Sequence, residues 1–300
     1  MDVAGKAALD PVELSDRAAR GFRLVELHLT SGTARMPPRD ARDMVERAGL
    51  RVCSVHAPPG VSLGAPHGAI VKEEVVLAAR LADAVMPRGL PRRVVVHLGP
   101  DLPLGTPFRA WRFARAWAIR EGAHDLAEAA RLARLENGPL LVCVENHAWC
   151  WLDGRKVFPP AGRLREDFGV LAELAAEAGV GESLGFCLDV CHALSACAAT
   201  DGVVGLADFV RQMGPRLSLV HFSGIRGLGA CRADHGLPLG EADADMATAV
   251  LRALGRVGFS GPVVAEVLEP DSRFAPGMEA TARFLESLSR GLNVCRVAAS

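Results

Sequence analysis

Carboxylates and imidazoles recur at one kind of position in this sequence, directly after a short apolar run. Six such residues are spread over most of the chain: His56, His97, Glu145, Asp189, His221 and Glu266. A buried apolar segment has no internal use for a charge, so these side chains need partners. Three carboxylates with one imidazole form a mostly oxygen-donor set that suits Mn²⁺, Mg²⁺ or Co²⁺, whereas additional imidazoles favour Zn²⁺. Their types therefore predict a divalent-metal site.

Further polar residues lie close to these positions along the chain. His192 follows Asp189 by three residues, and the pair Asp234 and His235 lies in the loop after His221. Of the nine histidines, all but His67 and His124 fall at or just beyond the end of an apolar run, which packing alone does not explain. His147 is expected beside the metal ligands or facing a substrate. Glu26 and His28 are instead expected to pair with helix ends or neighbouring loops.

The apolar runs have the composition of buried strands. They are rich in Val and Leu and nearly continuous, as in strands covered on both faces, and they span 24–29, 51–56, 93–98, 140–145, 185–190, 217–222 and 262–267. Amphipathic segments with helical spacing precede or follow them at 11–20, 39–48, 72–86, 109–135, 166–178, 203–213, 243–257 and 277–290. This alternation predicts parallel strands joined by crossover helices.

A (β/α)₈ barrel, a TIM barrel, accounts for this order in one domain covering residues 1–300. An eighth strand would have to come first, where only DVAGKAAL is available, and that segment is a poor strand by propensity. We therefore expect the first strand to be degenerate or the barrel to be incomplete there. In such a barrel the carboxyl ends of all strands face one mouth, so the polar residues at those ends should converge.

Composition narrows the class of protein further. The 34 basic and 35 acidic residues give a net charge of −1, which argues weakly against a polyanion partner such as a nucleic acid. The eight cysteines form no Cys-x-x-Cys pair, the first residues show no signal-peptide pattern, and no apolar run is long enough to span a membrane. These features predict a soluble cytoplasmic protein. Serine hydrolysis has no support, because a Gly-x-Ser-x-Gly motif is missing.

The order of the motifs resembles that of the xylose-isomerase-like TIM-barrel superfamily over roughly residues 12–290. The matching pieces are GFRLVELHL, SVHAP, VVVHLG, VENH, LDVCH, LVHFSG, DHGLPLGE and VVAEV. This superfamily contains sugar isomerases and epimerases and also the endonuclease IV family of apurinic-site nucleases. The resemblance implies an enzyme acting on a small carbohydrate, and barrels of this kind often form homo-oligomers.

In the sugar enzymes of this group, a Glu, Asp, His, Glu quartet binds one divalent cation. The resemblance assigns that role here to Glu145, Asp189, His221 and Glu266. It also implies that Glu145 and Glu266 act as acid and base, moving a proton through an ene-diolate held by the metal. His192 would contact substrate oxygens, and Arg226 is a candidate phosphate or hydroxyl contact. The favoured function is a metal-dependent isomerase or epimerase of a small sugar, sugar phosphate or related hydroxy-carbonyl compound.

The nuclease relatives define an alternative with three zinc ions. Its ligands here would be His56, His97, Glu145, Asp189, His192, His221, Asp234, His235 and Glu266. In those nucleases, however, the late motif is Asp-x-His, whereas Asp234 and His235 are adjacent and Gly236 takes the usual histidine position. Nucleic acid is therefore the less favoured substrate. A third alternative is a barrel that binds a metal or ligand without catalysis.

Overall fold

The computed structural model describes residues 2–66, 68–99, 102–103, 108–147, 150–152, 155–158, 161–162, 165–197, 202–227 and 234–292. Its centre is a closed barrel of eight parallel strands. They are β1 (Val3–Ala8), β2 (Leu24–His28), β3 (Arg51–His56), β5 (Arg92–Leu98), β7 (Leu140–Glu145), β10 (Leu184–Asp189), β11 (Leu217–Phe222) and β14 (Val263–Ala265). Each strand pairs with its neighbours in this order, and the ring closes where β1 pairs with β14. The predicted fold class is confirmed.

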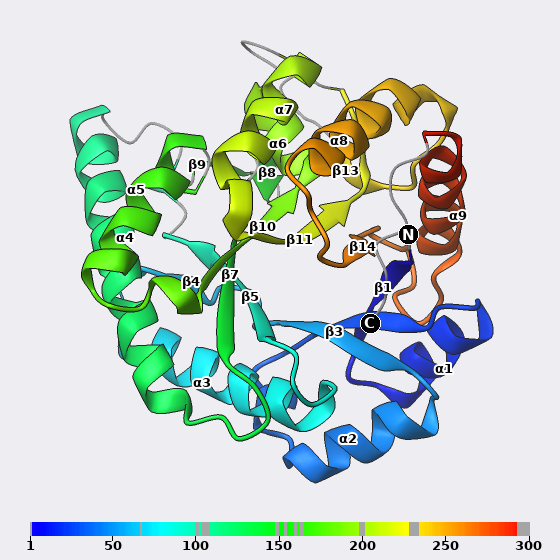
Figure 1. Cartoon of the computed structure of the whole chain (residues 1–300), viewed down its shortest axis with the longest axis horizontal. Helices are drawn as coiled ribbons and strands as arrows, with labels where there is room; N and C mark the ends of the chain where they lie inside the picture. The colour runs from blue at the N-terminus through cyan, green and yellow to red at the C-terminus, as the bar shows by residue number, and fades with distance from the viewer. Residues whose placement is uncertain are drawn as a thin grey trace.

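Helices surround the barrel on its outside (Figure 1). Among the described residues they are α1 (Pro11–Ala19), α2 (Pro38–Arg47), α3 (Gly68–Val85), α4 (Phe108–Ala133), α5 (Arg165–Glu177), α6 (Val190–Cys197), α7 (Gly202–Met213), α8 (Ala244–Arg256) and α9 (Pro276–Gly291). The sequence pattern predicts all of them except α6, which starts directly at the end of β10 and carries His192. None of the helices in the described ranges is long and apolar enough to cross a membrane.

Short elements occupy several loops. The short strands are β4 (Ser62–Leu63), β6 (Leu102–Pro103), β8 (Cys150–Leu152), β9 (Arg155–Phe158), β12 (Gly224–Arg226) and β13 (Asp234–Leu237). Single 3₁₀ turns are η1 (Thr33–Arg35), η2 (Gly181–Ser183), η3 (Gly214–Arg216) and η4 (Glu241–Asp243). The strands β12 and β13 form an antiparallel pair within the long loop after β11.

The first strand is complete, which corrects the expectation that it is degenerate. In the six-residue strand β1, residues 3–5 pair in parallel with β14 and residues 5–8 pair in parallel with β2. Its Ala and Gly content has a packing reason. A side chain on Gly5 would begin only 3.3 Å from the ring of Phe22, and Ala4 and Ala7 are fully buried. Pairing with the neighbouring strands on both sides outweighs the low strand propensity of the residues in β1.

Two apolar regions fill the molecule. The larger one lies between the barrel and its helices, where Phe168, for example, packs edge-to-face on Phe186. The smaller one fills the barrel interior and is formed by Ala4, Cys53, Val95, Cys143, Cys187, Leu219 and Val264, with Leu24 packed against it. This interior layer supports the polar residues at the mouth.

Candidate metal centre and active site

The mouth residues stand two positions beyond the interior layer on seven strands. Because side chains of a strand alternate between its two faces, residues i and i+2 point the same way. The pairs are Ala4 and Lys6, Leu24 and Glu26, Val95 and His97, Cys143 and Glu145, Cys187 and Asp189, Leu219 and His221, and Val264 and Glu266. Each apolar residue therefore supports a polar residue above it, inside the barrel.

The structure brings the four predicted metal ligands together. One oxygen or nitrogen from each of Glu145, Asp189, His221 and Glu266 lies within 4.8 Å of the others. Two atoms that ligate the same cation, each at about 2.0–2.6 Å, can be separated by no more than about 4–5 Å. The spacing of this quartet therefore fits a single divalent ion.

The orientation of two of these ligands supports the same conclusion. Nδ1 of His221 and Oε2 of Glu266 form an ion-pair contact at 2.5 Å, both atoms are buried, and neither has a partner at hydrogen-bond geometry among the described residues. A buried polar atom without a partner costs free energy, so such atoms are rare unless a ligand or ion satisfies them. The carboxylates and the imidazole of the quartet are the donor set expected for Mn²⁺, Mg²⁺ or Co²⁺.

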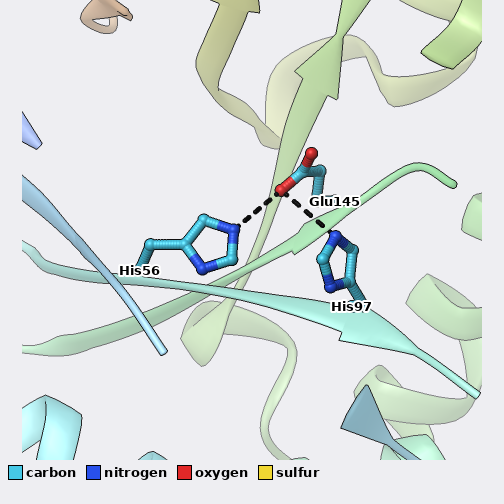
Figure 2. Close-up of side chains that lie close together, drawn as sticks. All are labelled: His56, His97 and Glu145. Carbon is cyan, nitrogen blue, oxygen red and sulfur yellow. Dashed lines mark hydrogen bonds and ion pairs between the residues drawn. The ribbon is translucent and has the colours of Figure 1, made fainter. Parts of the chain in front are cut away.

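Two further histidines face one oxygen of Glu145, Oε2. Oε2 of Glu145 lies 3.1 Å from Nε2 of His56 and 3.6 Å from Nε2 of His97. Figure 2 shows both rings pointing at that one oxygen, from β3 and β5. The other oxygen, Oε1, lies 3.4 Å from Nδ1 of His192 and 3.6 Å from Nδ1 of His221. Glu145 therefore joins the metal quartet to the group formed with His56 and His97.

His192 is held at the start of α6. Its backbone N–H donates to Oδ1 of Asp189 at 2.7 Å, and its ring Nδ1 lies 2.9 Å from the carbonyl oxygen of Asn146. The Asn146 side chain in turn accepts from the backbone N–H of Asp189 and donates to its carbonyl oxygen. Asn146 thus links the ends of β7 and β10 and fixes the position of Asp189.

Sequence reasoning missed two residues of this site, Lys6 and Glu26. We expected Glu26 to pair with a helix end or a neighbouring loop, but it contacts side chains inside the barrel instead. Both of its oxygens lie 3.1 Å from Nε2 of His221, and Ser54 donates to it at 2.7 Å. Lys6 contacts Glu266 directly and lies 3.5 Å from Glu26. The signal that could have found both was the apolar-x-polar pattern shared with the other strand ends.

Burial and charge together set the pKa values of the mouth. Burial would raise the pKa of Glu145, but the charge of His221 and the polar contacts from His192 and His221 outweigh it and hold that pKa well below its usual range. For Glu266, Lys6 and His221 likewise overcome burial and lower the pKa. Burial also opposes protonation of His192, yet Asp189 and Glu145 raise its pKa to about 9. Glu145 and Glu266 are therefore ionised at neutral pH, and His192 is protonated.

For other residues at or near the mouth, burial is the main cause of the pKa shift. Burial lowers the pKa of His97 to about 4, so its ring is neutral, and it raises the pKa of Asp189. The thiol of Cys187 lies near Glu145 and His221, but burial raises its pKa well above the usual value. A neutral thiol is a poor metal ligand compared with a thiolate, so the carboxylates and imidazole remain the better donors.

A cavity of about 580 Å³ opens above the quartet. Its lining includes Lys6, His56, His97, His147, His192 and His235 together with apolar Val267, Leu268 and Met278. Of the quartet, Glu145 and Glu266 line this cavity, whereas Asp189 and His221 do not. The size is that of a small-molecule site. Two of the four residues therefore border the cavity, and of these the Glu266 side chain is 23% exposed and that of Glu145 is 1% exposed.

The remaining predicted residues lie in or near the loop after β11. Arg226 forms a two-point ion pair with Asp243, at 2.6 and 2.8 Å, and is not part of the cavity lining. His235 lines the cavity, with its ring centroid 5.9 Å from that of His192. Asp234 begins β13 at an exposed position. Within the described part of the chain, neither Asp234 nor His235 belongs to a group with metal-ligand spacing.

Residues 14–288 match the family described as xylose isomerase-like TIM barrel. Because this match covers most of the chain, the protein belongs to that family. No curated protein sequence matches it.

Solved structures share the fold at low sequence identity. A sugar phosphate isomerase/epimerase from Parabacteroides distasonis is 16% identical, with a TM-score of 0.59 over 96% of this chain and 94% of that one. D-allulose 3-epimerase from Methylomonas sp., in complex with D-allulose, is 15% identical, with a TM-score of 0.64 over 95% and 97%. An L-ribulose 3-epimerase is 15% identical, with a TM-score of 0.64 over 99% of both chains. These likenesses concern the fold.

Proposed function

We propose that this protein is a divalent-metal-dependent isomerase or epimerase of a small sugar or related hydroxy-carbonyl compound. The observation that carries the proposal is that two of the four residues of the quartet also line the cavity. All four side chains converge at cation spacing, but only Glu145 and Glu266 also reach the cavity. An enzyme that moves a proton on a metal-bound sugar needs metal ligands together with bases at the wall of the substrate cavity. The sugar epimerases among the structural neighbours support the same substrate class.

The residues can be given roles in this reaction. A bound divalent cation would polarise the carbonyl and the adjacent hydroxyl of the substrate and so acidify the C–H between them. Glu145 and Glu266, both ionised, are the groups that can accept that proton. Removal by one glutamate and delivery by the other to the opposite face would invert the carbon. Return of the proton to the former carbonyl carbon, with the hydroxyl proton passing to the former carbonyl oxygen, would move the carbonyl instead.

Histidines complete the proposed substrate site. His192 is protonated and fixed by Asn146 and Asp189, so it can donate a hydrogen bond to a substrate oxygen. His97 and His147 stack with ring centroids 4.6 Å apart and form one wall of the cavity. The apolar side chains of Val267, Leu268 and Met278 form part of the lining as well. Such mixed walls can bind the hydroxyl and C–H surfaces of a sugar.

The abasic-site nuclease is the second candidate, and the His56, His97 and Glu145 group favours it because that group could hold a second cation. A three-metal site would also need a third group around His192, Asp234 and His235, and the described residues do not form one at ligand spacing. We therefore expect no chelator-sensitive incision of a duplex carrying one abasic site, with or without added Zn²⁺. Efficient incision would favour the nuclease over the isomerase.

Solvent-hydrogen exchange tests the proposed reaction directly. The protein is incubated in D₂O with Mn²⁺ and, separately, D-allulose, D-fructose, L-ribulose and a wider panel of ketoses and aldoses. We expect deuterium to enter the carbon next to the carbonyl of at least one sugar, detected by NMR, and to stop on chelation. Glu145→Gln and Glu266→Gln should abolish the exchange, whereas Glu73→Gln, an exposed carboxylate on α3, should not. No exchange across the panel would contradict the proposal and favour a non-catalytic barrel.

A further inference from the structure

Lys6 and Glu26 face each other on the first two strands of the barrel. They are register partners in the parallel pair of β1 and β2, and Nζ of Lys6 lies 3.5 Å from Oε1 of Glu26. Glu26 is fully buried, and the Lys6 side chain is only 12% exposed. A charged pair at this depth is costly unless each member also serves other groups. Each member does so, because each contacts one residue of the metal quartet.

Glu26 contacts the ring nitrogen of His221 that points away from the quartet. Both Glu26 oxygens lie 3.1 Å from Nε2, whereas Nδ1 lies 2.5 Å from Glu266 and 3.6 Å from Glu145. An imidazole that ligates a cation is neutral, with a lone pair on the ligating nitrogen and its proton on the other nitrogen. With a carboxylate facing Nε2, the proton belongs on Nε2, and the lone pair of Nδ1 is directed at the cation position.

Lys6 has the corresponding contact with Glu266. Its Nζ contacts Oε1 of Glu266, and Oε2 is the oxygen that lies beside Nδ1 of His221 and has no partner at hydrogen-bond geometry in the described part of the chain. The two oxygens of Glu266 are therefore divided between the lysine and the cation position. Ser54 holds Glu26 from β3 at 2.7 Å, so the pair is itself fixed in place.

We propose that Lys6 and Glu26 are a paired positioning device for the metal centre. Glu26 sets the tautomer of His221 so that it binds the cation through Nδ1, and Lys6 turns Glu266 so that it binds through Oε2 alone. Strands β1 and β2 carry none of the four ligands, and they orient two ligands carried by β11 and β14. This inference rests on the metal site of the proposed function and adds two residues and two defined ligand atoms to it.

Mn²⁺ titration by calorimetry tests the pair without reference to activity. Loss of a residue that orients a metal ligand lowers metal affinity by about 10- to 100-fold. We expect losses of that size for Glu26→Ala and Lys6→Met, and a smaller loss for Glu26→Asp, which keeps the carboxylate. Because the two residues act together, the double variant Lys6→Met/Glu26→Ala should lose less affinity than the product of the two single losses. It also removes both charges of the Lys6 and Glu26 pair, so it can be measured if a single variant does not fold.

The control is Asp83→Asn, which removes a carboxylate from a buried ion pair with Arg92 at the amino end of β5, away from the mouth. This variant should bind Mn²⁺ as the wild type does. Variants at Lys6 and Glu26 that bind Mn²⁺ within about twofold of the wild type would overturn the inference while leaving the proposed function intact. A wild type that binds no divalent cation would overturn both.

The ligating nitrogen can be identified by ¹⁵N NMR of the histidine rings, with Zn²⁺ as a diamagnetic probe and His221→Gln for assignment. We expect a proton on Nε2 of His221 and the metal-induced shift on Nδ1. In Glu26→Ala, the Nε2 proton signal should be lost or broadened by exchange. A shift on Nε2 in the wild type, or an unchanged His221 signal in Glu26→Ala, would contradict the assigned role of Glu26.

Discussion

Oε2 of Glu145 lies 3.1 Å from Nε2 of His56, while Oε1 of the same carboxylate faces His192 at 3.4 Å. The carboxylate is thus held from two sides, and its two oxygens have different neighbours. Nδ1 of His56 lies 2.9 Å from the carbonyl oxygen of Ala57, so the imidazole is fixed as well. In the proposed reaction, His56 would hold Glu145 in the orientation needed for proton transfer.

Replacing His56 should therefore impair the proposed catalysis more than substrate binding. For His56→Ala we expect kcat to fall roughly 10- to 100-fold, the range for residues that orient a functional group, with a smaller change in KM. Steady-state kinetics on the sugar that exchanges deuterium provides the measurement. His124→Ala, on the exposed side of α4, is the matched control. A changed KM with an unchanged kcat would instead make His56 a substrate contact.

Two ligands of the quartet should respond differently to excess metal. Asp189→Asn and Glu145→Gln should both weaken Mn²⁺ binding, because each removes a charged ligand. At saturating Mn²⁺, Asp189→Asn should regain part of its activity, since Glu145 and Glu266, which line the cavity, both remain. Glu145→Gln should stay about 10²- to 10⁴-fold below the wild type, the usual contribution of a general acid or base. Equal recovery of the two variants would argue against a proton-transfer role for Glu145.

The pH dependence of stability should reflect Asp83. Burial would raise the pKa of this carboxyl, but the backbone N–H groups of Glu136 and Asn137 and the guanidinium of Arg92 lower it below 3.8. Because the folded-state pKa is depressed, the stabilisation is complete above pH about 4 and is lost as the pH falls through the folded-state value. Urea unfolding of Asp83→Asn should show a deficit of about 1–3 kcal/mol at pH 7 that shrinks towards pH 3. A deficit that is constant with pH would contradict this assignment.

A cavity in the helix layer should lower the stability of the protein without changing metal binding at the mouth. Phe168 on α5 is fully buried and packs edge-to-face on Phe186 and Phe209, with ring centroids 5.1 and 6.4 Å away. Phe168→Ala should lower the free energy of unfolding by about 3–5 kcal/mol, the cost of a large cavity in a core. Mn²⁺ affinity of the folded protein should not change, because Phe168 does not line the cavity. Denaturant unfolding and calorimetry together check both parts.

Much of the barrel follows from the chain itself. The seven predicted strands lie within two residues of the observed ones, because buried parallel strands form continuous apolar runs that end in polar residues. The same rule predicted that Glu145, Asp189, His221 and Glu266 meet, as they do, since a parallel barrel brings all strand ends to one mouth; the family resemblance singled out these four. Local sequence was sufficient for the strands and for this convergence.

The first strand could not be predicted in the same way. Its small residues leave room for side chains from the rest of the barrel, as Gly5 does for Phe22. Local propensity does not include such contacts, so it wrongly argues against a strand. Without that strand, Lys6 has no assigned place, and the partner of Glu26 is unknown. Arg226 shows the opposite difficulty, because its ion pair with Asp243 depends on a hairpin and a turn that no periodicity reveals.

The most direct test of the metal centre is a crystal structure of the protein with Mn²⁺, read by anomalous scattering. We predict one ion at the mouth of the barrel, within about 2.0–2.6 Å of one atom from each of Glu145, Asp189, His221 and Glu266, with Nδ1 as the ligand from His221. An ion held elsewhere, or no ion at this position at saturating Mn²⁺, would contradict the account.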